Sequence, residues 1–272
     1  MNYKLAVIGV GNMAKAVITG IQESSVAVSE IILFDKNSIQ YSSLINGRCN
    51  YILAASITDA VKDADCVLLS VKPQNFPEVL KEIASLNGHD KKLYITIAAG
   101  ITVATVSNAL SGADVIRVLP NLPMTIGKGV SVICKNDTIS GERFAFVCSL
   151  FEAAGSNIII DESEMNRIIS VTSSSPAYVF KFIDAIYKGA LEQGLSEKGL
   201  VDAICDVFIG SALLLKQSEA TPEELASRVA SKGGTTEQAL FQLTQGNIDK
   251  IISRAMIACT QRADELGRPS DK

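Results

Sequence analysis

Residues 7–17, VIGVGNMAKAV, decide the fold that we expect for this chain. They contain a G-x-G-x-x-A pattern, formed by Gly9, Gly11 and Ala14. The first glycine permits a tight turn, the second lets a backbone approach a pyrophosphate, and the small third residue lets a helix pack closely on a strand. A short apolar run precedes the motif and a helical pattern follows it, so the stretch predicts a dinucleotide-binding βαβ unit. The residues expected to hold the dinucleotide here are Gly9, Gly11, Asn12 and Met13.

The first half of the chain alternates between short apolar runs and helical patterns. The runs are rich in β-branched residues, which is typical of strands in a parallel sheet covered by helices. The predicted strands, of which the last two are weaker, cover residues 4–10, 30–35, 66–71, 93–99, 114–120, 129–134 and 156–161. We therefore predict an α/β Rossmann domain with a mostly parallel sheet over residues 1–161.

The remainder, residues 162–272, carries apolar residues at helical spacing and no strand pattern, which predicts an all-helical domain. We expect one helix to open at Ser196 as its N-cap, and another at the Thr-Pro-Glu-Glu sequence that starts with Thr221. The long helices are apolar around much of their circumference, more than a lone small bundle needs. This pattern favours a subunit interface, and the alternative is a central core helix.

Composition limits the partners that we expect. The chain has 272 residues, is 47% hydrophobic and carries a net charge of −4, and no basic patch stands out. These features argue against a nucleic-acid partner and against an anionic membrane surface. The chain has no run of about 18 apolar residues that could span a membrane, and its start lacks the features of a signal peptide. We therefore expect a cytoplasmic protein.

The cysteines and the single histidine give little support to other chemistries. Six cysteines are scattered along the chain without a C-x-x-C pair, which is typical of buried, reduced thiols. The only histidine, His89, lies in a polar turn. A zinc site and a Ser-His-Asp hydrolase are both disfavoured on this ground, and we expect no metal.

Three further turns end predicted strands at the edge where ligands of such folds bind. Asp35 could hydrogen-bond the ribose hydroxyls of NAD, whereas Lys36 could hold the 2′-phosphate of NADP. The pair leaves the preference between NADH and NADPH open, and it could equally be a solvated strand end. Lys72 and Pro73, in SVKPQ, are placed to touch the cofactor unless they form a plain turn. Asn121, in LPNLP, lies between prolines that fix its direction, and we expect it to contact the cofactor.

A second glycine-rich turn lies near the end of the chain, in VASKGGTTEQAL, residues 229–240. Its glycines and threonines predict a tight turn that opens a helix. Such a turn aims free backbone N–H groups at whatever lies in front of it, and anions bind there. The chain is therefore expected to contain two anion-binding turns.

Taken together, these stretches resemble the pyrroline-5-carboxylate reductase family over essentially the whole chain. The motifs that carry the resemblance are IGVGNMAKAVITG, SVKPQ, IRVLPNLP, TSSSPAYVFKFIDA and ASKGGTTEQAL. The resemblance implies a Rossmann domain followed by a helical domain whose helices interlock in a homodimer, with homodecamers in some members. It also implies an NAD(P)H-dependent oxidoreductase that reduces 1-pyrroline-5-carboxylate to L-proline, the last step of proline biosynthesis and a part of amino-acid biosynthesis.

The resemblance further implies roles for residues of the second half. The second glycine-rich turn would hold the substrate carboxylate. Thr236 would meet the ring nitrogen as the catalytic contact, in an orienting or relaying role with solution supplying the proton, because a hydroxyl is a poor acid. Thr235 has the alternative of capping the helix, and Glu219 that of an exposed helix end. The implied substrate-binding residues are Ser174, Glu219, Ser231, Gly233, Gly234, Thr235 and Thr236.

The chain departs from the family pattern at several positions. The family's S-G-S-G reads Thr172, Ser173, Ser174 and Ser175 here, so both glycines are absent, which could narrow the pocket. Lys232 replaces a proline, which is a milder change. Two alternatives to the implied activity therefore stay open: a related imine or carbonyl reductase, and a catalytically silent nucleotide-binding paralogue.

Overall fold

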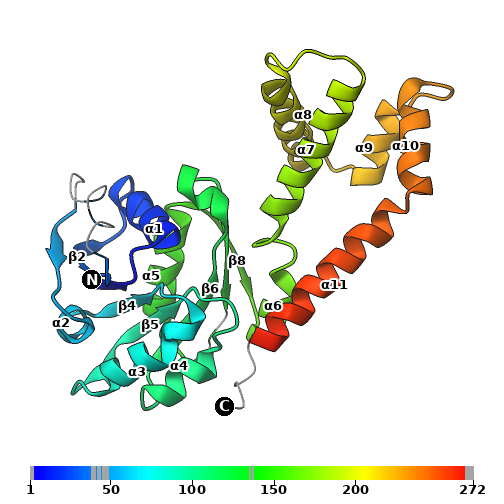
Figure 1. Ribbon diagram of the computed structural model, residues 1–272. Helices are drawn as coiled ribbons and strands as arrows, with labels where there is room; N and C mark the ends of the chain where they lie inside the picture. Colours follow the sequence, from blue (N-terminus) through cyan, green and yellow to red (C-terminus); the bar gives the residue numbers. More distant parts are fainter. Residues whose placement is uncertain are drawn as a thin grey trace. The chain divides into compact units, whose positions relative to one another are not determined.

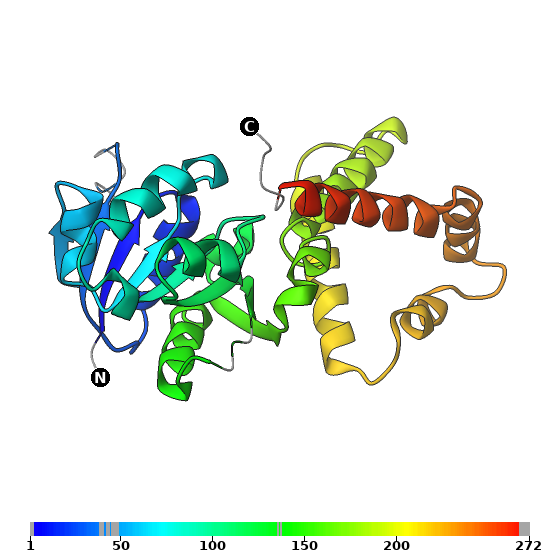
Figure 2. The same cartoon turned by 90° about the horizontal axis from the view of Figure 1, so that it is seen from below.

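The computed structural model describes residues 3–37, 41, 44, 49–134, 136 and 138–266, and it divides into two compact units. The first unit comprises Met1–Pro176 together with Cys259–Lys272, and the second comprises Ala177–Ala258. Figures 1 and 2 show that strands lie only in the first unit and that the second is built of helices. The predicted domain boundary after residue 161 differs from these limits and stays a prediction.

A sheet forms the centre of the first unit (Figure 1). It has eight strands in the order β3-β2-β1-β4-β5-β6-β7-β8. Neighbouring strands are parallel except β6 and β7. The strand order reverses between β1 and β4, and ligands of such folds bind at the carboxyl edge of this switch point. The predicted α/β class is confirmed. The strands are β1 (Tyr3–Ile8), β2 (Val28–Phe34), β3 (Tyr51–Leu53), β4 (Cys66–Leu69), β5 (Leu93–Thr96), β6 (Asp114–Leu119), β7 (Gly129–Cys134) and β8 (Gly155–Ile160).

Helices cover both faces of this sheet. They are α1 (Asn12–Gln22), α2 (Ile57–Lys62), α3 (Phe76–Ala84), α4 (Val103–Ala109), α5 (Gly141–Glu152) and the short α6 (Met165–Ile168). Residues of α1 and α5 share one apolar core with Leu5 and Val7 of β1, and residues of α2, α3 and α4 share another with Ala6 and Ile8. Successive side chains of a strand point to opposite faces, so a strand buried on both faces reads as a continuous apolar run. Each fully buried Leu, Ile or Val stabilises the fold by roughly 1.5–3 kcal/mol.

A third apolar cluster joins the last strands to the end of the chain's last long helix, α11 (Ile248–Leu266). Ala263 of this helix is 5% exposed. The last turns of α11 therefore belong to the first unit, although the helix begins in the second. The buried members of the cluster are Leu119, Val132, Cys134, Met165, Ile169 and Ala263.

A polar network also holds this end of α11. The guanidinium of Arg117, which is 1% exposed, donates to Asn166 Oδ1 at 2.8 Å, and Asn166 Nδ2 donates to Asp264 Oδ1 at 2.8 Å. Burial lowers the pKa of Arg117, and the negative charge of Glu162 opposes that shift. Arg117 thus links the sheet, α6 and α11, a contact that sequence reasoning missed because its partners lie far apart along the chain.

The second unit exposes an unusual amount of apolar surface. Its helices are α7 (Ser175–Glu192), α8 (Leu200–Gln217), α9 (Pro222–Val229), α10 (Thr235–Gln245) and the first part of α11. Ala190 and Ile204 are its only buried apolar residues within the range 177–258, all of which is described. On α8, Val207, Ile209 and Leu214 are each more than half exposed. The chain's own core does not cover these side chains, which favours the predicted subunit interface over the alternative of a central core helix.

Two local predictions were wrong. Ser196 does not cap α8, because the helix begins only at Leu200, after Gly199 with φ of 71°, and Ser196 Oγ instead accepts the N–H of Lys198 at 3.3 Å. The short β3 was missed, since three residues are too few to show a strand period. By contrast, Thr221 caps α9 as predicted and forms a capping box with Glu224. Among the described residues, no helix is long and apolar enough to cross a membrane.

Candidate active site

The first glycine-rich turn lies at the carboxyl end of β1, at the switch point of the sheet. Gly9 has φ of 89° and donates its N–H to the carbonyl oxygen of Phe34 at 2.8 Å. A Cβ atom at this position would lie 2.7 Å from the carbonyl oxygen of Ser70. Both its backbone conformation and the neighbouring strand therefore require glycine here.

The start of α1, immediately after this turn, is open. Gly11 is its N-cap, and a Cβ atom there would meet nothing within 4 Å. Within the described part of the chain, no side chain caps α1, and its first turn holds no acidic residue. The first N–H groups of a helix have no partner in the helix itself. Those of Asn12 and Met13 can therefore donate to a bound anion, which the positive end of the helix dipole also attracts. These features fit the pyrophosphate of a dinucleotide.

Asp35, directly after β2, supports the glycine-rich turn. One carboxylate oxygen accepts the N–H of Val10 at 2.7 Å, and the other accepts the N–H of Asn37 at 2.8 Å. The Tyr41 hydroxyl donates to the backbone oxygen of Asp35 at 3.0 Å, which fixes the backbone as well. Asp35 is therefore held in one place beside the turn and is no freely solvated strand end.

The two lysines predicted to contact the cofactor differ in their surroundings. Lys36 Nζ lies 3.2 Å from Glu78 Oε2 on α3, and both side chains are 69% exposed. Lys72 is exposed and precedes Pro73, which opens a short 3₁₀ turn at the end of β4. Among the described residues, the Lys72 side chain has no hydrogen bond or ion pair and is available to a ligand at the same sheet edge.

The Asn121 side chain is buried and hydrogen-bonded within the protein, which its sequence context did not predict. It is 8% exposed, its Nδ2 donates to the carbonyl oxygen of Thr172 at 3.1 Å, and its Oδ1 accepts the N–H of Val130 at 2.8 Å. The amide thus ties the turn after β6 to β7 and to the serine-rich segment. This positioning role was not predicted, and the contact of Asn121 with the cofactor stays a prediction.

The serine-rich segment at the start of α7 is bonded both to its own neighbours and to α11. Ser174 Oγ lies 3.2 Å from Cys259 Sγ, and Ser175 Oγ donates to the carbonyl oxygen of Ser170 at 3.1 Å. The Oγ of Ser173 is buried and has no hydrogen-bond partner among the described residues. Local contacts and contacts with Asn121 and α11 therefore both hold this segment, and the substrate contact of Ser174 stays a prediction.

The second glycine-rich turn, in the second unit, opens α10. Gly233 has φ of 72°, and Gly234 is the N-cap, with its N–H donating to the carbonyl oxygen of Ser231 at 2.9 Å. Thr235 is the first residue of the helix and no side chain caps it, so the alternative that Thr235 is a cap is wrong. Thr236 follows and is half-buried.

Glu237 is the residue of this turn that sequence reasoning missed. Its carboxylate reaches back and accepts the N–H of Gly233 at 2.9 Å. Among the described residues, the N–H groups of positions 235–237 have no acceptor, as expected at a helix start. An anion could therefore bind there beside a carboxylate that the chain already supplies. The spacing of Glu237 three residues after the N-cap could have revealed it.

Glu219 lies in the loop between α8 and α9 and is exposed. Among the described residues, its carboxylate has no hydrogen bond or ion pair. The predicted role of Glu219 at the substrate site stays a prediction.

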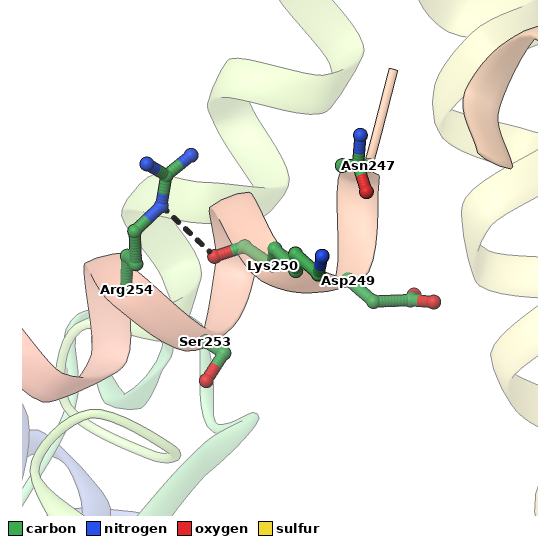
Figure 3. Close-up of a pocket in the computed structure, with 5 residues that line it drawn as sticks. All are labelled: Asn247, Asp249, Lys250, Ser253 and Arg254. Carbon is green, nitrogen blue, oxygen red and sulfur yellow. Dashed lines mark hydrogen bonds between the residues drawn. The ribbon is translucent and has the colours of Figure 1, made fainter. Parts of the chain in front are cut away.

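An open surface hollow lies at the start of α11 (Figure 3). Arg254 Nε donates to the carbonyl oxygen of Lys250 at 3.3 Å, and Figure 3 draws this bond as a dashed line. None of the predicted site residues lines this hollow, and a small-molecule site is normally a more enclosed cleft. Its lining residues are Asn247, Asp249, Lys250, Ser253 and Arg254.

No disulfide joins any of the six cysteines, all of which the structure describes, and burial makes four of them poor nucleophiles. Burial raises the pKa of the Cys49, Cys66 and Cys148 thiols, and that of Cys134 to about 11. A thiol with so high a pKa is protonated at neutral pH and is no nucleophile. Within the described residues, no three His, Cys, Asp or Glu side chains gather as a metal site would require.

The sheet order, the glycine-rich turn at its switch point and the appended helical unit define a class of protein, the Rossmann-type dinucleotide-binding proteins with a separate helical unit. A family model described as pyrroline-5-carboxylate reductase dimerisation matches residues 162–266, and one described as NADP oxidoreductase coenzyme F420-dependent matches residues 4–100. The chain is 32% identical to the pyrroline-5-carboxylate reductase of Haemophilus influenzae over 98% of each chain. It therefore belongs to the pyrroline-5-carboxylate reductase family.

Two further comparisons agree with this assignment. The pyrroline-5-carboxylate reductase of Corynebacterium melassecola is 30% identical over 97% of this chain and 98% of its own. The solved structure of a pyrroline-5-carboxylate reductase from Coxiella burnetii superposes with a TM-score of 0.88, at 26% identity, over 99% of this chain and 100% of that chain. The similarity thus spans both units.

Proposed function

We propose that this protein reduces 1-pyrroline-5-carboxylate to L-proline with hydride from NAD(P)H, the last step of proline biosynthesis. The observation that carries the proposal is the open start of α1 after Gly9 and Gly11, at the switch point of a sheet in a chain of this family. A helix start without its own cap is an anion site, and a dinucleotide supplies the anion.

In this proposal the first unit binds the cofactor. Backbone N–H groups at Gly11, Asn12 and Met13 hold the pyrophosphate, Asp35 meets the adenosine ribose, and Lys72 and Pro73 border the same edge. When bound, the cofactor supplies a hydride to the C=N carbon of the cyclic imine. The protein contributes by holding the two flat reactants face to face and by excluding water.

The second unit binds the substrate. The free N–H groups of positions 235–237, together with Ser231, Gly233 and Gly234, receive the substrate carboxylate. Thr236 orients the ring nitrogen, while solution supplies the proton. Ser174 and Glu219 complete the proposed substrate-binding set, which accounts for the second anion-binding turn of the chain.

We also infer a cytoplasmic homodimer formed by the helices of the second unit. The exposed apolar side chains of α8 support this assembly, since burying such surface is the main driving force for association. Further assembly into a homodecamer is a separate question, and light scattering of the purified protein tells the two sizes apart.

The test is to follow the absorbance of NADH or NADPH with 1-pyrroline-5-carboxylate as the second substrate. Imine-dependent oxidation of either cofactor supports the proposal. Turnover confined to another cyclic imine or to a carbonyl compound would favour a related reductase. Cofactor binding without turnover on any of these substrates would favour a silent nucleotide-binding paralogue.

A further inference from the structure

The end of β2 carries a fixed negative charge where the adenosine ribose is expected. Both Asp35 carboxylate oxygens accept backbone N–H groups, those of Val10 at 2.7 Å and Asn37 at 2.8 Å. A carboxylate offers about four acceptor sites, so two remain for other donors. Ribose hydroxyls are such donors, whereas a 2′-phosphate offers only negative oxygens toward the same atoms.

A second acidic residue pairs with Lys36, the cation that follows Asp35 in the sequence. Lys36 Nζ lies 3.2 Å from Glu78 Oε2. The formal charges of Asp35, Lys36 and Glu78 are −1, +1 and −1, so this group carries a net charge of −1. Lys36 is therefore already paired with an acid on α3, and this exposed pair weakens its attraction for a phosphate to a modest extent.

The sequence supplies no replacement for this cation in the segment that follows. Residues 37–47 contain neither Lys nor Arg, the side chains that ordinarily hold a 2′-phosphate at this position. The first basic residue after Lys36 is Arg48, twelve positions further along the chain.

We propose that this chain selects NADH over NADPH, with Asp35 and Glu78 acting together against the 2′-phosphate. The inference rests on the proposed cofactor site. Asp35 acts directly, by accepting the ribose hydroxyls and repelling a phosphate. Glu78 is a positioning residue, because it acts by holding Lys36 and neutralising its charge. Like charges brought together are a common means of rejecting a wrong ligand.

The experiment is calorimetric titration of the full-length protein with ADP-ribose and with 2′-phospho-ADP-ribose, which lack the nicotinamide and report only on the adenosine end. We expect ADP-ribose to bind at least about tenfold more tightly, and the difference to shrink as salt is added. Equal affinities, or tighter binding of the phosphorylated ligand, would overturn the inferred selectivity while leaving the cofactor site in place. If neither ligand binds, the proposed cofactor site itself is wrong.

Two variants test the named residues. Asp35→Asn keeps the shape and removes the charge, and its amide oxygen can still accept one of the two N–H groups, those of Val10 and Asn37, that the carboxylate accepts. We expect it to bring the two affinities within roughly threefold of each other. Glu78→Gln is exposed and should fold normally, and we expect it to tighten 2′-phospho-ADP-ribose about two- to fivefold with ADP-ribose unchanged. Glu82→Gln, one turn further along α3, is the matched control with the same change in charge. Identical titrations for the two glutamine variants would remove Glu78 from the inference.

Discussion

Each of the two glycine-rich turns of this chain precedes a helix, but different kinds of contact hold the two turns in place. The first turn packs against the sheet. Gly9 lies close to the backbone oxygen of Ser70, after β4, and the Asp35 carboxylate, after β2, accepts the N–H of Val10. The second lies among exposed helices, and Glu237 of its own helix holds Gly233. The first turn therefore depends on residues far away in sequence, and the second on residues within one helical turn. Tertiary contacts hold the first turn, whereas a local contact holds the second, and both helix starts keep free N–H groups for a ligand.

We expect the largest effect from a substitution at Gly9 that disrupts the first turn. Gly9→Ala places a Cβ atom 2.7 Å from a backbone oxygen at φ of 89°, and we expect it to lower the free energy of unfolding by about 3 kcal/mol or more in urea titrations. Gly11→Ala, where a Cβ meets nothing within 4 Å, should retain nearly full stability and lose cofactor affinity in calorimetry. Equal stability of the two variants would contradict a sheet-supported turn.

The second turn is best tested through turnover. Thr236→Ala should reduce kcat for imine reduction by roughly 10- to 100-fold, because the substrate is no longer oriented, while the melting temperature stays near wild type. The matched control is Thr244→Ala on the same helix, whose hydroxyl donates to the carbonyl oxygen of Leu240. An unchanged kcat for Thr236→Ala would remove this residue from the mechanism.

Removal of the Asp35 carboxylate, which accepts two backbone N–H groups beside the first turn, should have an intermediate effect on stability. Asp35→Ala leaves the N–H groups of Val10 and Asn37 without their acceptor, and we expect the free energy of unfolding to fall by about 1–3 kcal/mol. Chemical denaturation measures this loss. For comparison, Asp63→Ala removes the same charge at an exposed position and should change stability by no more than about 0.5 kcal/mol.

The smallest effect concerns the carboxylate of the second turn. Glu237→Gln keeps a group that can accept the Gly233 N–H but removes a negative charge beside the proposed carboxylate site. We expect the KM for the imine to fall about two- to threefold with kcat unchanged. Glu223→Gln, in the first turn of α9, is the control for the general loss of charge. A rise in KM would mean that Glu237 helps to bind the substrate.

The sequence was informative wherever a local pattern determines the structure. The glycine-rich turns, the Thr221 cap and every strand except the short β3 follow from periodicity and turn chemistry, and all of these predicted features are present. What the sequence could not show are contacts between distant segments. Asp35 bonding to Val10, Asn121 bonding to Val130 and Thr172, and the buried Arg117 network each depend on which strands become neighbours. Residue type alone suggested ligand contacts for two of these side chains, and the structure adds a supporting role for both.

The course of α11 has a consequence for how the chain may be cut or fused. This helix starts in the second unit, and its end, with Ala263 and Asp264, packs in the first. The second unit is thus an insertion within the first, closed at both ends, and not a tail. Truncation before Ala263 would damage the dinucleotide-binding unit, although its sheet ends about a hundred residues earlier. Because the first unit holds both ends of the insertion, it also restricts the inserted segment when that segment unfolds, as a cross-link restricts a loop.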